Sequence, residues 1–168
     1  MTLSMHQASA PLFIQGLTGL SGVLDKAIAH AADRKIDPQA LLGFRLYPDM
    51  LPFTRQVQVA CDFAKGAVGR LAGGEVPAFE DTETSFEDLK ARIDKTVAYL
   101  KSVEPARLDG AEDRDIALVR RGESLSFKGG DYLFAQALPN FYFHVTTAYA
   151  ILRHNGVEIG KKDFLATR

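Results

Sequence analysis

Two polar side chains one helical turn apart are the first candidates for chemistry in this sequence. Asn140 and His144 lie at positions i and i+4 of an aromatic-rich segment, so a helix places them on the same face. Helical periodicity puts His144 within the apolar arc of that helix, which predicts that its ring points into the core. A buried imidazole needs a partner for each ring nitrogen, and Asn140, another helix, a water or a metal has to supply it.

The second predicted helix, residues 52–71, carries further polar candidates. The same angular count places Gln56 inside its apolar arc, Gln58 beyond the edge of the arc and Asp62 nearly opposite. Gln56 is therefore the best-placed inward polar residue by periodicity. Gln58 and Asp62 are also one turn apart and can form their own pair, at a groove or at a dimer contact.

These residue types leave three interpretations open. One is a divalent metal site for Zn²⁺ or Ni²⁺, although zinc prefers His, Cys and carboxylate ligands to amide oxygens. Another is a buried hydrogen-bond network that fixes the second helix against the last one. The third is a pocket for a small-molecule ligand without a metal.

The other reactive residues give weaker signals. Cys61, the only cysteine, lies in the apolar stripe of the second helix, where a free cysteine is usually a small buried hydrophobe. A single cysteine excludes an intramolecular disulfide and suits a reducing cytoplasm. His6 and His30 are expected to be exposed. The sequence has no Ser-His-Asp order, phosphate loop or dinucleotide-binding glycine pattern.

Composition limits the partners of the protein. The chain of 168 residues has 46% hydrophobic and 24% charged residues, the values of an ordinary soluble globular protein. Its net charge of −1 argues against a nucleic-acid surface, which would be basic. No apolar run approaches the ~20 residues of a membrane span, and no secretory signal opens the chain. We therefore expect a cytoplasmic protein with no nucleic-acid or membrane partner.

Four amphipathic segments must position the candidate side chains. The apolar spacing predicts helices over residues 12–34, 52–71, 86–104 and 129–154. Short apolar runs on either side of Arg121-Gly122-Glu123 predict a β-hairpin before the last helix. Residues 1–9 are predicted to be a loose tail. The sequence therefore predicts one domain over residues 1–168, an all-α four-helix bundle with a small hairpin.

Two features of these helices predict local structure. The last helix has a heptad-like seam that includes Phe134, Leu138 and Phe141, and Pro139 within it is expected to kink or divide the helix. In the first helix, Gly16, Gly19 and Gly22 fall three residues apart. Glycine lowers helix stability, so this strip either lets another backbone approach closely or marks a weak, frayed helix.

The last predicted helix also carries a family resemblance. His144, followed by Leu152-Arg153 and Gly156-Val157, resembles the last helix of the DinB/YfiT-like superfamily. One bacterial family of unknown function within that superfamily is similar in further segments of the chain. These segments are residues 138–144, 149–153 and 160–165, together with residues 55–58 and 62–64 of the second helix.

The resemblance implies a four-helix bundle, often dimeric, with a site between the second and last helices. Members of the superfamily typically hold a divalent metal with three histidines, one from the second helix and an i, i+4 pair from the last. In this sequence His144 keeps its histidine, Asn140 stands at the other position of the pair, and Gln56 or Gln58 stands at the position on the second helix.

Two functions follow from the resemblance. The first is that of an uncharacterised DinB-like protein, a metal-dependent hydrolase or transferase, with a degenerate site that involves His144, Asn140, Gln56, Gln58 and Asp62. The alternative is a non-catalytic, small-molecule-binding or stress-associated bundle protein. In both cases we expect a homodimer that uses helix faces.

Overall fold

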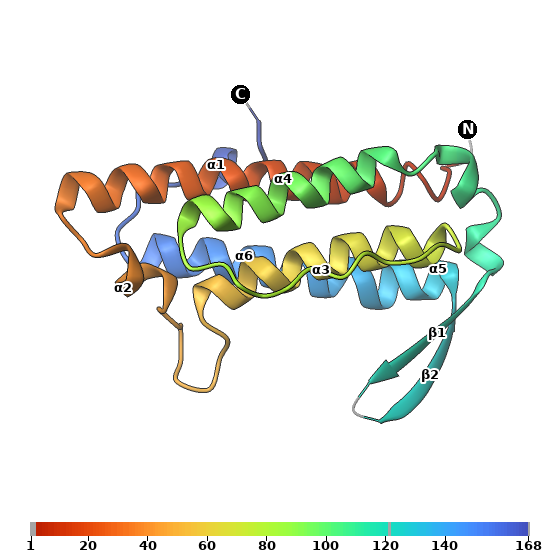
Figure 1. Ribbon diagram of the computed structural model, residues 1–168. Coiled ribbons are helices and arrows are strands. Elements are labelled where there is room, and N and C mark those ends of the chain that lie inside the picture. Colours follow the sequence, from red (N-terminus) through yellow and green to blue (C-terminus); the bar gives the residue numbers. More distant parts are fainter. Residues whose placement is uncertain (1–2, 121, 168) are drawn as a thin grey trace.

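Four long helices form the protein. The computed structural model describes residues 3–120 and 122–167. The long helices are α1 (Ala10–Arg34), α3 (Phe53–Leu71), α4 (Phe86–Ser102) and α6 (Leu138–His154). Figure 1 shows α1 and α4 in one layer and α3 and α6 in the other, and each helix packs on its neighbours around the bundle. The fold confirms the all-α bundle predicted from the sequence.

Shorter elements connect these helices. They are α2 (Pro38–Leu42), η1 (Pro105–Leu108), η2 (Ala111–Asp113), β1 (Asp115–Arg120), β2 (Glu123–Lys128), α5 (Gly129–Asp131), η3 (Tyr132–Ala137) and α7 (Lys161–Phe164). The core between the two helix layers is aromatic and aliphatic. The rings of Phe13 on α1 and Phe141 on α6 meet edge to face with their centroids 4.9 Å apart, a geometry that aromatic pairs prefer.

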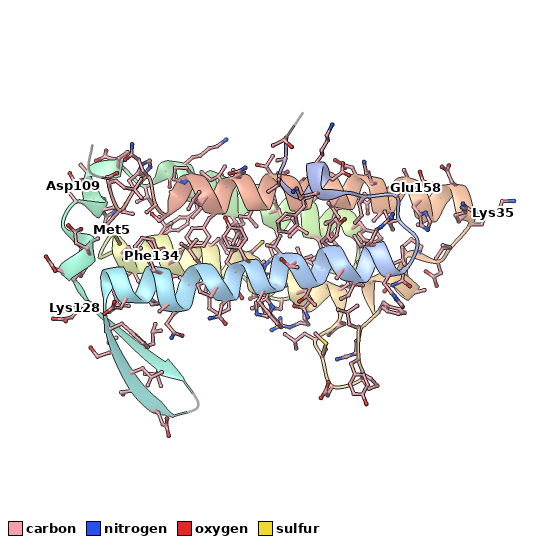
Figure 2. All side chains as sticks on the ribbon, turned by 180° about the vertical axis from the view of Figure 1, so that it is seen from behind. Met5, Lys35, Asp109, Lys128, Phe134 and Glu158 are labelled. Atoms are coloured by element: carbon pink, nitrogen blue, oxygen red, sulfur yellow. The ribbon has the colours of Figure 1, made fainter. Side chains whose placement is uncertain are left out.

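The last helix is interrupted by a π-helical turn before its proline. Residues 132–137, η3, are π-helical, and Pro139 is the second residue of α6, where its missing N–H is tolerated. The predicted break is therefore a change of helix type. Because a π turn holds more residues than an α turn, the positions that it buries are shifted, and they are Tyr132, Leu133 and Ala137. Phe134, expected in the core, is instead 55% exposed (Figure 2).

The predicted hairpin is present and projects from the bundle beside α5 (Figure 1). Ile116 pairs with Phe127 and Leu118 with Leu125, so these four side chains share one face of the two-stranded ribbon. Ile116 is buried, and Leu118 and Phe127 pack partly against the core, so this face is turned toward the bundle. Arg121 of the expected turn lies outside the described residues.

The start of the chain differs from the loose tail expected over residues 1–9. Met5, Ala8 and Ser9 are buried, and the Ser9 hydroxyl donates a hydrogen bond of 2.6 Å to the Met5 carbonyl. The apolar side chains of Met5 and Ala8 add to the core, which a short polar-looking segment did not reveal. Residues 1 and 2 of that expected tail are outside the described part of the chain.

Two of the three glycines in α1 allow close packing within the chain. A Cβ atom on Gly19 would lie 2.4 Å from the Phe164 carbonyl oxygen, and one on Gly16 would lie 2.7 Å from the Phe141 ring. A Cβ on Gly22 would meet nothing within 4 Å. The close approach expected at this strip is therefore made by α6 and α7 of the same chain.

None of the helices in the described residues is long and apolar enough to cross a membrane.

Candidate functional site

His144 and Gln56 face each other across the gap between α6 and α3. The distance between His144 Nδ1 and Gln56 Oε1 is 2.7 Å, and Gln56 Nε2 donates to the Leu51 carbonyl at 3.0 Å. Because that amide nitrogen is committed to Leu51, the amide oxygen must accept, so Nδ1 of His144 carries the hydrogen. The network thus selects the neutral tautomer in which Nε2 has the free lone pair.

The surroundings of His144 keep its ring neutral. Burial lowers the pKa of His144, because the charged imidazolium loses solvation there. The Phe63 ring from α3 lies nearly parallel to it, at 19° and with the centroids 5.8 Å apart. The ring is half-buried, whereas Gln56 is only 1% exposed. The inward direction predicted for both side chains is confirmed.

Asn140 and Gln58 do not join this pair. The Asn140 side chain donates from Nδ2 to the Gln136 carbonyl at 2.7 Å, one turn back and at the end of η3. The Gln58 side chain accepts from Arg55 at 2.7 Å and donates to Glu83 at 2.6 Å. Of the two glutamines considered for the second helix, Gln56 is therefore the one that faces His144.

Asp62 belongs to a third environment, an ionic cluster around the buried Arg92. Its Oδ1 lies 2.9 Å from Arg92 and 3.1 Å from Lys65, and the pair with Gln58 that its spacing suggested is not formed. Arg92 comes from α4 and its side chain is only 1% exposed. The chain segment between α3 and α4 covers this side of the bundle and brings two further carboxylates to Arg92.

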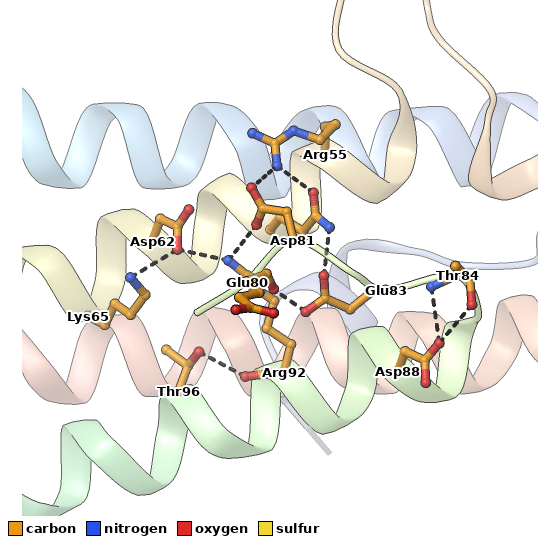
Figure 3. Close-up of polar contacts among 11 residues, drawn as sticks. Arg55, Asp62, Lys65, Glu80, Asp81, Glu83, Thr84, Asp88, Arg92 and Thr96 are labelled. Carbon is orange, nitrogen blue, oxygen red and sulfur yellow. Dashed lines mark hydrogen bonds and ion pairs between the residues drawn. The ribbon is translucent and has the colours of Figure 1, made fainter. Parts of the chain in front are cut away.

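Figure 3 shows how Arg92 holds that segment. Its guanidinium lies 3.0 Å from Asp81 and 2.9 Å from Glu83, and it donates to the Glu80 carbonyl at 3.0 Å. Arg55 pairs with Asp81 at the outer edge. The same segment buries Gln58, which periodicity had placed beyond the apolar arc. The acidic residues of this segment neutralise a buried cation.

The arrangement does not fit a catalytic zinc or nickel centre. Such a centre takes three protein ligands, usually His, Cys or carboxylate, and leaves one position open. No group of three such residues converges within the part of the chain that the structure describes. Near His144 the available donors are its own Nε2 and amide oxygens, and the Gln56 oxygen already accepts from Nδ1. Gln58 and Asp62 are committed to the ionic cluster.

Cys61 and the other histidines do not contribute to this region. Cys61 is fully buried, and burial raises the pKa of its thiol to about 12, so it stays protonated as expected for a small hydrophobe. His6 and His30 are half-buried rather than exposed.

A hollow of about 310 Å³ opens one turn from His144, between α3, η3 and the hairpin. Its apolar wall comprises Phe63 and the hairpin side chains Leu118, Leu125 and Phe127. Polar side chains enter from the helices. These polar side chains are those of Asp62, Arg70, Tyr132, Gln136 and Asn140. An apolar wall with a few convergent polar groups is typical of a small-molecule site.

Sequence reasoning missed most of this hollow. Along the second strand of the hairpin, serines alternate with Leu125 and Phe127. This alternation could have shown that one face of the hairpin is apolar. The pairing of Gly66 with Arg70, one turn apart on α3, could have drawn attention to the arginine. What the sequence lacked was the placement of the hairpin against α3, because that contact joins segments about fifty residues apart.

The fold is that of a DinB-like four-helix bundle. The chain belongs to the family described as "Domain of unknown function (DUF1993)", whose model matches residues 5–165. It is similar to the crystal structure of a DinB family member protein from Shewanella denitrificans, with a TM-score of 0.91 and 40% identity. That match covers 98% of this chain and 93% of the other. No curated protein matches the sequence. The family resemblance noted in the sequence is therefore confirmed.

Proposed function

We propose that this protein is a non-catalytic binding protein for a small amphipathic molecule, which it takes up in the hollow between the hairpin and α3. The observation that carries the proposal is the hollow itself, in which the apolar hairpin face meets polar groups from two helices. Its volume lies at the lower end of the ~300–1,000 Å³ usual for ligand pockets, so the molecule is small.

The state of the His144–Gln56 pair favours binding over metal-dependent catalysis. A metal-dependent hydrolase or transferase would need further ligands beside His144, and the side chains at those positions are amides with partners of their own. As arranged, the pair joins α6 to α3, and Phe63, whose ring stacks on His144, lines the hollow. We place the protein in the cytoplasm, where its free cysteine would stay reduced.

The hairpin gives a direct test of the proposed site. Leu125 lines the hollow and is 36% exposed, so Leu125→Asp changes the apolar wall with little effect on the core. Ser126→Asp is the matched control, because the neighbouring residue of a strand points to the opposite face. The probe is N-phenyl-1-naphthylamine, an uncharged dye whose fluorescence rises in apolar surroundings.

We expect the dye to bind the parent protein and the Ser126→Asp variant alike. Leu125→Asp should weaken binding about tenfold, since a carboxylate would then lie in the apolar wall. Circular dichroism of each variant checks that the bundle is intact. If the parent shows no saturable fluorescence change, or if both aspartates act equally, the hollow is not the binding site.

A further inference from the structure

Arg70 supplies the positive charge among the residues that line this hollow, and none of the described carboxylates pairs with it. The neighbouring charges are balanced, because Arg55, Lys65 and Arg92 pair with Asp62, Asp81 and Glu83. Arg70 forms no salt bridge with any of the described residues. Its hydrogen bond runs instead from Nη1 to the Tyr132 hydroxyl, at 3.1 Å. A positive charge therefore remains available at the wall of the hollow.

Gly66 leaves room for the Arg70 guanidinium, and Tyr132 binds it. On α3, Gly66 lies one turn before Arg70, and a Cβ atom on Gly66 would lie 2.4 Å from Arg70 Nη1. The absence of a side chain at Gly66 thus lets the guanidinium lie close against the helix. From the other side, the Tyr132 hydroxyl of η3 accepts its hydrogen bond. The guanidinium is positioned before any ligand arrives, which lowers the entropic cost of binding.

We propose that Arg70 binds the carboxylate of a small organic acid, whose apolar part lies between Phe63 and the hairpin. This inference rests on the binding function proposed above and adds the chemical class of the ligand. A guanidinium presents its donors in a planar fork that matches a carboxylate. Because the Tyr132 oxygen accepts from Arg70, its own hydrogen is free to donate to the same carboxylate.

The volume and the charge of the hollow indicate the size and the charge of the ligand. A volume of about 310 Å³ lies at the lower end for ligand pockets, which suits a small monocarboxylic acid such as octanoate. Asp62 also lines the hollow, but Lys65 and Arg92 neutralise its charge. A monocarboxylic acid therefore meets one unpaired positive charge at one end and apolar side chains at the other.

Octanoate and octanamide form a matched pair of probes for this inference. Both have an eight-carbon chain and nearly the same shape, and they differ in charge. Each is titrated against the protein with bound N-phenyl-1-naphthylamine, and the displacement of the dye gives its affinity. For the parent protein at neutral pH we expect octanoate to bind about tenfold more tightly than octanamide, a factor that corresponds to ~1.4 kcal/mol.

Two variants test whether Arg70 causes the preference. Arg70→Met should remove it while the dye still binds. Gly66→Ala should weaken it, because the new methyl group displaces the guanidinium, and should not lower the melting temperature, because alanine favours a helix. The controls are Arg34→Met, an exposed arginine outside the hollow, and Gly22→Ala, where a Cβ meets nothing. Both controls should keep the preference.

The possible failures separate the two proposals. If the parent binds the dye but takes octanoate and octanamide equally, the acid specificity is wrong and the binding function stands. If the preference persists in Arg70→Met, the assignment of Arg70 is wrong. If the parent does not bind the dye at all, the binding function fails and the specificity fails with it.

Discussion

His144 Nδ1 and Gln56 Oε1 lie 2.7 Å apart, although 88 positions separate the two residues in the chain. This contact joins α6 to α3 at the place where relatives of the superfamily are expected to carry a metal site. In this protein the two residues satisfy each other instead. Their interaction should therefore be measurable as protein stability.

His144→Ala should destabilise the protein by about 1–3 kcal/mol. Gln56 is only 1% exposed, so the variant leaves its amide oxygen buried without a donor. A loss of about 1–3 kcal/mol is usual for a buried polar group that loses its partner. Urea unfolding measures the free energy. Asn140→Ala is the control, since Asn140 is half-buried and bonds only to the backbone of its own helix. Equal losses in both variants would contradict a special role for the His–Gln pair.

Histidine 144 should also make stability depend on pH. Burial lowers its pKa in the folded protein, so the unfolded chain binds a proton more readily. Its contribution is therefore fully present above the ordinary histidine pKa of 6.5 and is lost as the pH falls through the lower, folded value. Urea unfolding of the parent and of His144→Gln, each at pH 7.5 and 5.5, tests this. The parent should lose more stability than the variant on acidification, and parallel losses would refute the assignment.

Arg92→Met should cost more than removal of any surface cation of the same cluster. The change leaves Glu83, whose side chain is 11% exposed, and two half-exposed aspartates without their buried partner. We expect a loss of about 3 kcal/mol, the lower end for a broken buried ion pair, because the aspartates retain some solvent.

Arg55→Met is the comparison for Arg92, since Arg55 and Asp81 are each 38% exposed. The exposed ion pair contributes about 0–1 kcal/mol. The change also removes the hydrogen bond that Arg55 donates to the buried Gln58, so we expect a total loss of about 1–2 kcal/mol, less than for Arg92→Met. A small effect of Arg92→Met in the same measurement would mean that the segment between α3 and α4 is held by other contacts.

A three-histidine site should form where the superfamily is expected to have one. Gln56 faces His144, so Asn140→His combined with Gln56→His would supply two further imidazoles beside it. Titration calorimetry should show zinc or nickel binding far tighter than in the parent, and weaker as the pH falls below ~6.5. Asn140→His with Gln58→His is the control, because Gln58 points to Glu83. Similar affinities for both double variants would show that the helix positions are misassigned.

We also expect a homodimer, as the family resemblance implies. Gly16 and Gly19 of α1 cannot provide its interface, because α6 and α7 of the same chain cover them. Phe134 and Phe143 remain 55% and 56% exposed and are the better candidates. Light scattering at micromolar concentration should give a dimeric mass, and Phe143→Ser should shift it toward the monomer. A monomeric mass for the parent would end this expectation.

Periodicity was sufficient where a side chain's direction depends on its own helix. Gln56 and His144 lie inside apolar arcs, and both point inward as predicted. Gln58 lies outside such an arc and is nevertheless buried, because a distant acidic segment covers it. The burial of Arg92 could not be predicted from its own helix either. It depends on three carboxylates, and two of them come from the segment between α3 and α4. The hollow was unpredictable for a related reason, as its wall comes from the hairpin.

The π-helical turn at residues 132–137 has a consequence for comparing members of the family. It adds one residue to the helix, and with that residue Tyr132 and Gln136 line the hollow while Phe134 turns outward. A relative that lacks this residue would have an unbroken α-helix, and its equivalents of Tyr132 and Gln136 would rotate by about 100°. The number of residues between Gly129 and Pro139 is thus a marker, readable from an alignment, of which relatives keep the same ligand wall.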